Sequence, residues 1–268
     1  MLNVYTMANG RMKDSFERFC RFLRGFNPNA SLKVIPFDDD IREIEEISRN
    51  FGGCLVDADP GLDAIAQEVF GDDEYRRGIP AWRYVRKFNA FLGHEKPFIF
   101  LDCNQVVVHD LEPLQAAVSS ASIDMAFGFR SMRLRSVPLV LLHKFYDLVS
   151  PGLGVGYNTA VFVSRGGAVR LDLMRGIFSA NSRRLIGKAP EQGMLAYYLA
   201  ISGKSHALLG DIKPDCAAMV PAKAPLVMRG KELLVGGRRV VYCIKYTGQE
   251  FKVAPELAIR LLASHVRR

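Results

Sequence analysis

The sequence lacks the features that define several large protein classes. No apolar run longer than about 18 residues escapes a charge or a Gly/Pro break, so a membrane-spanning helix is not expected. The five cysteines are widely spaced and form no C-x-x-C pair, which argues against a disulfide framework or a zinc cage and fits a reducing cytosol. No block of five or six like charges is present, so we expect no nucleic-acid partner.

The composition that is present is that of a globular protein. Of the 268 residues, 49% are hydrophobic and 24% are charged, which excludes a disordered chain. The net charge of +8 favours phosphates or an anionic membrane surface as partners. We therefore expect a cytoplasmic protein that can touch the inner face of a membrane.

In the first half of the chain, short apolar runs alternate with amphipathic segments. This order predicts an α/β protein with a mostly parallel sheet and helices on both faces, and such sheets bind ligands at the carboxyl ends of their strands. Asp40 with Glu43 predicts a capping box at the start of the second helix. The expected strands span 2–6, 32–37 and 97–102, and the expected helices include 13–24, one opened by Asp59-Pro60, and 79–92.

After residue 110 the pattern loosens. We find no internal repeat and no low-complexity segment. The chain therefore reads as a single domain over 1–268. The elements expected in this half are helices over 111–119, 190–201 and 255–266, and strands over 124–129, 155–164 and 238–246.

The most informative segment is the apolar run Phe98–Leu101, which ends abruptly in Asp102, Cys103 and Asn104. Because strand side chains alternate faces, Asp102 and Asn104 are expected on one side and Cys103 in the core. Two oxygen ligands at the end of a strand suit Mg²⁺ or Mn²⁺ with a phosphate. The alternative is a strand that simply ends in turn-forming residues.

Residues 101–114, which begin Leu-Asp-Cys-Asn and continue to Asp110-Leu-Glu-Pro-Leu, resemble the D-x-D strand and turn of GT-A glycosyltransferases. The closest resemblance is to the family that includes glycogenin and bacterial lipopolysaccharide galactosyltransferases. Further segments resemble that family in the right order, so that the resemblance spans nearly the whole chain. These segments are 1–9, 86–92, 156–163 and 190–195.

The resemblance implies transfer of a sugar from a nucleotide-diphosphate sugar, with UDP as the nucleotide and retention of anomeric configuration. The acceptor would be a glycan or a lipid-linked sugar in bacterial surface-polysaccharide synthesis. Residues 1–110 would bind the nucleotide, and 111–268 would supply the acceptor side and a C-terminal helix. The implied donor-binding residues are Thr6, Ala8, Asn9, Asp38, Arg83, Arg86, Lys87, Asp102, Cys103, Asn104 and Lys245, and the implied catalytic residues are Glu191, Gln192 and Asn158.

Three of the basic residues follow a helical spacing. On an α-helix, Arg83, Arg86 and Lys87 lie at i, i+3 and i+4 and share one face, which could neutralise the diphosphate. The alternative is a solvated basic face. Glu191 at the start of a helix could equally be a partner of the helix dipole.

Two departures from the family pattern concern the metal. Asn104 replaces the second carboxylate of D-x-D, and Lys245 stands where the family has a histidine. The implied Mn²⁺ or Mg²⁺ site on Asp102 and Asn104 is therefore either weakened or replaced by a metal-independent arrangement in which Lys245 substitutes for the cation.

Two other functions stay open at this point. A non-catalytic relative that binds nucleotide sugars would explain the altered metal ligands. A sugar nucleotidyltransferase would use a similar sheet but needs a Gly-rich basic loop after the first strand. Residues 8–13, with one glycine and two basic residues, match such a loop only weakly.

Overall fold

The computed structural model describes residues 1–76, 78–92, 96–128, 158–179, 186, 190–221 and 224–245. The expected helix over 255–266 and the first residues of the expected strand over 155–164 lie outside these residues. Within them, no helix combines the length and the apolar character needed to cross a membrane.

The centre of the molecule is a seven-stranded, mostly parallel sheet with the order β10-β8-β9-β6-β1-β2-β3. Only β9 runs against its neighbours, β6 and β8. The sheet draws strands from both sides of residue 110. Its members are β1 Asn3–Ala8, β2 Ser31–Pro36, β3 Gly53–Leu55, β6 Phe98–Leu101, β8 Met125–Phe127, β9 Val161–Ser164 and β10 His206–Leu208.

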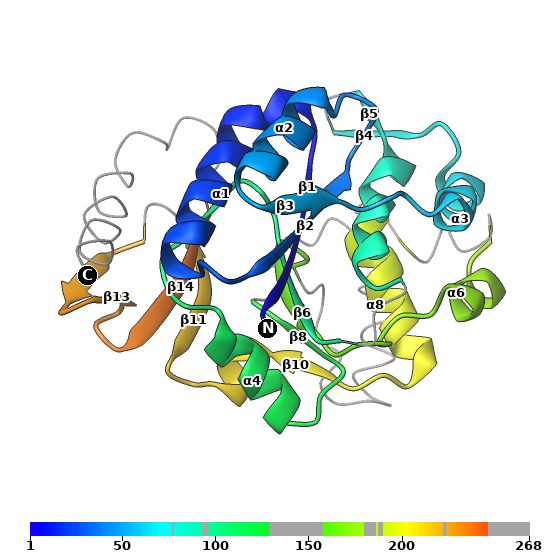
Figure 1. Cartoon of the computed structure of the whole chain (residues 1–268). Helices are drawn as coiled ribbons and strands as arrows, with labels where there is room; N and C mark the ends of the chain where they lie inside the picture. The colour runs from blue at the N-terminus through cyan, green and yellow to red at the C-terminus, as the bar shows by residue number, and fades with distance from the viewer. Residues whose placement is uncertain are drawn as a thin grey trace.

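Helices cover both faces of this sheet (Figure 1). One face packs against α1 Lys13–Phe26, α2 Arg42–Asn50, α4 Glu112–Ser120 and the short α9 Leu209–Ile212. The other face packs against α3 Pro60–Phe70, the 3₁₀ helix η2 Ala81–Ala90, α6 Leu171–Ile177 and α8 Pro190–Ser202. A short hairpin of β4 Glu74–Arg76 and β5 Ile79–Pro80 lies before η2.

The two faces make two separate hydrophobic cores because strand side chains alternate. In β6, Ile99 and Leu101 join the core with α1, whereas Phe98 and Phe100 join the core with η2 and α8. Phe162 of β9 stacks on Phe100, with ring centroids 5.0 Å apart. A strand buried on both faces is apolar at every position, which is why β6 was the clearest strand in the sequence.

A second, smaller sheet covers part of the α1 face. It has the order β11-β14-β13-β12, with β7 also paired to β14. The antiparallel register of β14 and β7 sets Lys245 opposite Gln105, three residues after Asp102. Its strands are β7 Gln105–Val107, β11 Cys216–Pro221, β12 Leu226–Arg229, β13 Glu232–Val235 and β14 Arg239–Lys245.

Two local expectations were wrong. The segment expected as an α-helix over 79–92 is the 3₁₀ helix η2. The expected capping box is absent, since α2 begins after Ile41 without a side-chain cap. Glu43 instead accepts a 2.7 Å hydrogen bond from Lys13, so a contact with another helix replaced the local one.

Candidate active site

The candidate site lies at the carboxyl ends of β1 and β6, which are neighbouring parallel strands. Asp102 directly follows β6, and its backbone N–H donates to the carbonyl of Ala160 (2.9 Å). The Gln105 N–H then donates back to the Asp102 carbonyl (3.2 Å), which closes a tight turn before β7 begins. The turn directs the chain from the central sheet into the small sheet and so toward β14.

Two lysines converge on the Asp102 carboxylate. Lys87 Nζ lies 2.9 Å from Oδ1, and Lys245 Nζ lies 3.5 Å from Oδ2. Burial raises the pKa of Asp102, but the two ammonium groups outweigh burial and hold the pKa below its ordinary value. Asp102 is therefore an anion between two cations, and the three side chains together carry one net positive charge.

Lys87 also ties this group to the loop before β9. Its ammonium donates to the Thr159 carbonyl (3.1 Å) and contacts Thr159 Oγ1 (3.4 Å). Thr159 Oγ1 in turn donates to Glu191 Oε1 in the first turn of α8, at the long distance of 3.5 Å. The candidate catalytic residue Glu191 is thus linked to Asp102 by three contacts, through Lys87 and Thr159.

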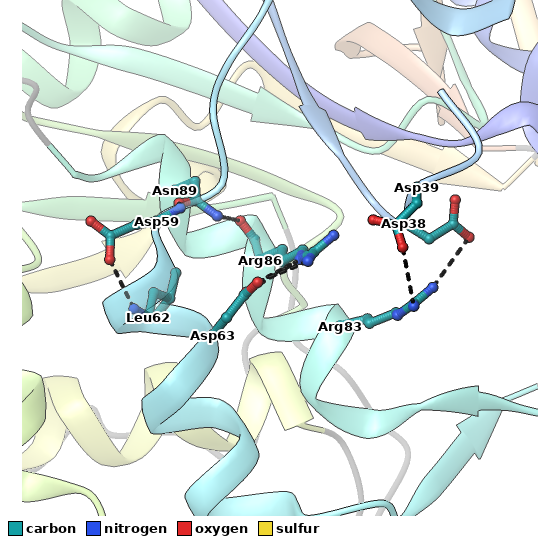
Figure 2. Close-up of polar contacts among 8 residues, drawn as sticks. All are labelled: Asp38, Asp39, Asp59, Leu62, Asp63, Arg83, Arg86 and Asn89. Carbon is teal, nitrogen blue, oxygen red and sulfur yellow. Dashed lines mark hydrogen bonds and ion pairs between the residues drawn. The ribbon is translucent and has the colours of Figure 1, made fainter. Parts of the chain in front are cut away.

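A second polar cluster lies at the ends of β1 and β2. Asn9 Nδ2 donates to Asp38 Oδ2 (2.6 Å), and both residues are buried. Arg83 forms looser ion pairs with Asp38 (3.8 Å) and Asp39 (3.9 Å), as Figure 2 shows. Since β1 is the neighbour of β6, this cluster and the Asp102 group lie along the same edge of the sheet.

Arg83, Arg86 and Lys87 do not share one face, contrary to the sequence expectation. A 3₁₀ helix turns about 120° per residue, so residues three apart align while the next residue points elsewhere. Arg83 and Arg86 both lie beside the Trp82 ring, whereas Lys87 reaches Asp102. Arg86 makes a two-pronged contact with Asp63 of α3 (Figure 2), with its shortest distance at 2.8 Å.

Several buried polar atoms at this edge have no hydrogen-bond partner among the described residues. Unpaired buried polar atoms are costly and uncommon, so those along this edge make it a candidate binding place for a polar ligand. These atoms are Thr6 Oγ1, Asn9 Oδ1, Arg83 Nε, Asn104 Oδ1, Gln105 Oε1 and Glu191 Oε2.

The other predicted residues take varied positions. Cys103 Sγ is buried in the α1 core beside Met12, on the opposite side from Lys87. The carbonyl of the buried Ala8 accepts from the Phe37 N–H (3.0 Å). Asn158 Oδ1 accepts from the Ala160 N–H (2.8 Å) and shapes the turn before β9, and Gln192 is half-buried in the first turn of α8.

Sequence reasoning missed Thr159 and Gln105 as members of this site. Thr159 links Lys87 to Glu191, and Gln105 Nε2 donates to the Ala160 carbonyl (2.6 Å). Both are buried polar residues, Thr159 just before β9 and Gln105 at the first position of β7. In the sequence, the only indication of their role was that a polar residue stands beside or at the start of a buried strand. This did not distinguish Thr159 and Gln105 from other polar residues.

The side chains at Asp102 do not fit a divalent cation. Both carboxylate oxygens already face ammonium groups, and the second oxygen ligand of the motif is the neutral amide of Asn104. Across the part of the chain that the structure describes, no three His, Cys, Asp or Glu side chains group as a metal site would require. A cation at Asp102 would have to displace at least one lysine.

Comparison with known proteins identifies the fold. No protein-family model matches the chain, and no curated protein matches it in sequence. The solved structure of the galactosyltransferase LgtC with donor and acceptor sugar analogues matches over 98% of this chain and 96% of its own, with TM-score 0.59 and 13% identity. An active-site mutant of LgtC gives TM-score 0.60 at 12% identity over the same shares. This is a GT-A glycosyltransferase fold.

A third neighbour extends the likeness to another enzyme. Mouse xyloside xylosyltransferase 1 in its apo form matches over 82% of this chain and 87% of its own, with TM-score 0.51 and 11% identity. All three neighbours are glycosyltransferases of the GT-A fold, which confirms the predicted fold class. At sequence identities of 11–13%, the structural similarity identifies the fold but assigns no role to individual site residues.

Proposed function

We propose that this protein is a glycosyltransferase that uses a nucleotide-diphosphate sugar, with UDP as the nucleotide. The observation that carries the proposal is the convergence of Lys87 and Lys245 on Asp102 at the carboxyl edge of a GT-A sheet. Buried polar atoms without a partner among the described residues lie along the same edge of the sheet. Together they form a polar, positively charged place for an anionic ligand.

The chemistry of the reaction explains why positive charge is needed there. Breaking the bond between the sugar and the diphosphate leaves negative charge on the diphosphate in the transition state. Fixed positive groups at that position stabilise the charge without having to reorganise. The Asn9–Asp38 cluster with Arg83 supplies donors and acceptors for the base and ribose at the other end of the nucleotide.

Glu191, Gln192 and Asn158 are proposed to meet the donor sugar and the acceptor. Glu191 Oε2 is buried and has no partner among the described residues, so it is available to accept a proton from an acceptor hydroxyl. We propose a glycan or lipid-linked acceptor, retention of configuration and a setting in bacterial surface-polysaccharide synthesis. Contact with an anionic membrane surface would follow from the net charge of +8.

The two descriptions of the metal site that the sequence left open are not equally supported. A weakened Mn²⁺ or Mg²⁺ site would need Asp102 to exchange a lysine for a cation. The ion pair with Lys245 favours the arrangement in which the lysine supplies the positive charge. In the reaction proposed here the positive charge at the diphosphate comes from the lysines.

The test measures binding and turnover separately. UDP, GDP, ADP and CMP are titrated calorimetrically into the wild-type protein, and UDP release is then assayed with UDP-glucose, UDP-galactose, UDP-N-acetylglucosamine and UDP-xylose. We expect UDP to bind and at least one UDP-sugar to be hydrolysed slowly without an acceptor. The Glu191→Gln variant should lower turnover by about a hundredfold while keeping UDP affinity. Glu46→Gln, an exposed position on α2, is the matched control.

Other outcomes would identify the alternatives. UDP binding without turnover of any sugar, in the presence of acceptor extracts, would indicate a non-catalytic nucleotide-sugar-binding protein. Formation of a nucleotide sugar from UTP and a sugar 1-phosphate would indicate a nucleotidyltransferase. If no nucleotide binds under any condition, the likeness is one of fold alone and the proposal is refuted.

A further inference from the structure

We propose that Lys245 replaces the divalent cation at the donor diphosphate, and that Asp102 is the counter-ion that positions Lys245 and Lys87. This inference rests on the proposed function and adds to it the identity of the group that meets the diphosphate.

The net charge of the site is consistent with a lysine in place of a divalent cation. Relative to the D-x-D pattern, Asn104 in place of a carboxylate adds one positive unit, and Lys245 in place of a neutral histidine adds another. The two changes together supply the charge of one divalent cation. They also weaken a divalent-cation site, because Asn104 offers only a neutral oxygen and the Lys245 ammonium cannot ligate a cation, so both changes act in the same direction.

The second step is position. Lys245 is held opposite Gln105 by the pairing of β14 with β7, and Gln105 closes the turn that starts at Asp102. The backbone therefore fixes where the lysine stem begins, and the Asp102 carboxylate 3.5 Å from Nζ fixes where it ends. A positive charge anchored at both ends is preorganised, which is what stabilisation of a leaving group requires.

The third step separates the two lysines. Lys87 is only 5% exposed, and its ammonium is engaged by Asp102 Oδ1, the Thr159 carbonyl and Thr159 Oγ1. Lys245 is 23% exposed, and its one ion pair among the described residues is the looser one with Asp102. Lys245 therefore has N–H donors available for a phosphate, whereas Lys87 holds Asp102 in place.

The fourth step explains what Asp102 does. Without a carboxylate between them, two ammonium groups in one partly buried site would repel each other, and each would lose charge-assisted hydrogen bonds. Asp102 contacts one lysine with each oxygen and is 27% exposed, so it faces the ligand side while it holds both. Asp102 acts here as a positioning residue.

The experiment compares UDP with uridine, which lacks the diphosphate, in EDTA and in Mn²⁺. For the wild type we expect the Kd of UDP to agree within about twofold in the two conditions. Lys245→Met should weaken UDP binding by about tenfold or more, the loss of one charge-assisted contact, and should leave uridine binding unchanged. A variant that merely damaged the fold would weaken both ligands.

Lys213→Met is the matched control. Lys213 is 22% exposed and pairs with Asp215 at 2.9 Å, so its environment resembles that of Lys245. It precedes β11, whose far end pairs with Lys245, and so lies at the opposite end of the small sheet. We expect Lys213→Met to bind UDP like the wild type.

Asp102→Asn provides a second discriminating variant. This variant, if folded, keeps both ammonium groups but loses the carboxylate that holds Lys245 in place, so it should bind UDP more weakly than the wild type in EDTA and bind uridine unchanged. If Asp102 were instead a metal ligand, its loss would weaken UDP binding in Mn²⁺ but not in EDTA. If Asp102→Asn does not fold, the wild-type comparison and Lys245→Met still decide the question.

Two results would overturn the inference. Wild-type UDP binding that requires Mn²⁺ would place the cation on Asp102 after all and would leave the proposed function intact. Unchanged UDP affinity in Lys245→Met would show that the lysine does not meet the diphosphate. Absence of UDP binding in every condition would instead refute the proposed function itself, so the two failures are distinguishable.

Discussion

Replacing Lys87 by methionine tests the central ion pair of the site. Methionine keeps an unbranched apolar stem but removes the ammonium, its 2.9 Å contact with Asp102 and its hydrogen bond to the Thr159 carbonyl. The ammonium also lies 4.8 Å from the centre of the Phe100 ring. A charge-assisted hydrogen bond contributes about 1.5–3 kcal/mol, and an unpaired buried carbonyl costs about 1–3 kcal/mol.

Two effects reduce that sum. The variant no longer has to desolvate a buried ammonium, and Lys245 still compensates Asp102 from the other side. We therefore expect the free energy of unfolding to fall by about 2–4 kcal/mol and the Tm by roughly 5–10 °C. Urea unfolding followed by circular dichroism measures the first quantity, and calorimetry the second.

The control is Lys13→Met, which removes a shorter but exposed ion pair. Lys13 lies 2.7 Å from Glu43, with the two side chains 49% and 53% exposed. Exposed pairs contribute little because water and salt screen them, so this variant should unfold like the wild type. Equal stability losses in the two variants would refute the reasoning, since burial would then not distinguish the two pairs.

The pH dependence of stability provides a second test of the ion pair between Lys87 and Asp102. The pKa of Asp102 is lowered in the folded protein, so its pairing stabilises the fold above the ordinary pKa of about 4. That contribution is lost as the pH falls from there through the lower folded-state pKa. The difference in stability between the wild type and Lys87→Met should therefore be constant from pH 8 to 5 and shrink below pH 4.

Two further variants separate structure from ligand binding. Arg86→Met breaks the two-pronged contact with Asp63, in which the Arg86 and Asp63 side chains are 11% and 16% exposed. The free energy of unfolding should fall by about 1–3 kcal/mol, while the Kd of UDP stays within about twofold of the wild-type value. A large loss of UDP affinity in a stable variant would contradict this expectation. In Gly193→Ala the added methyl group would overlap the backbone carbonyl of Ile186, so the first turn of α8 must shift and turnover should fall. The control is Gly176→Ala in α6, where the added methyl group meets open space. In the same thermal and activity assays this control should be neutral or slightly stabilising.

Much of the fold could be predicted because most strands of the central sheet carry their own local signal, although the three-residue strands β3 and β10 were not expected. β6 is apolar at every position, since both of its faces are buried, and Asp59-Pro60 marks the start of α3 through a side-chain cap to the Leu62 N–H (2.9 Å). The small sheet was harder to foresee, because the antiparallel pairing of β14 with β7 joins residues about 140 positions apart. No local pattern specifies such a pairing.

The candidate site also contains one part that the sequence predicted and another part that it did not. Asp102 stands out because an acidic residue follows a buried strand at the edge where ligands bind in α/β sheets. The separate roles of Arg83, Arg86 and Lys87 could not be foreseen, because an α-helix was expected where the chain forms a 3₁₀ helix. That change in helix type sends Lys87 toward Asp102 and leaves Arg86 to Asp63.

A lysine in place of a metal ion changes how the site depends on its surroundings. A bound cation must be acquired from solution and held by several ligands, whereas Lys245 is always present and needs only Asp102 to orient it. Its ammonium is a compact charge that is partly exposed, so added salt screens it as it screens other partly exposed ion pairs. Affinity for the diphosphate should therefore fall with increasing ionic strength and be indifferent to chelators, whereas a site that depended on a divalent cation would lose affinity in EDTA.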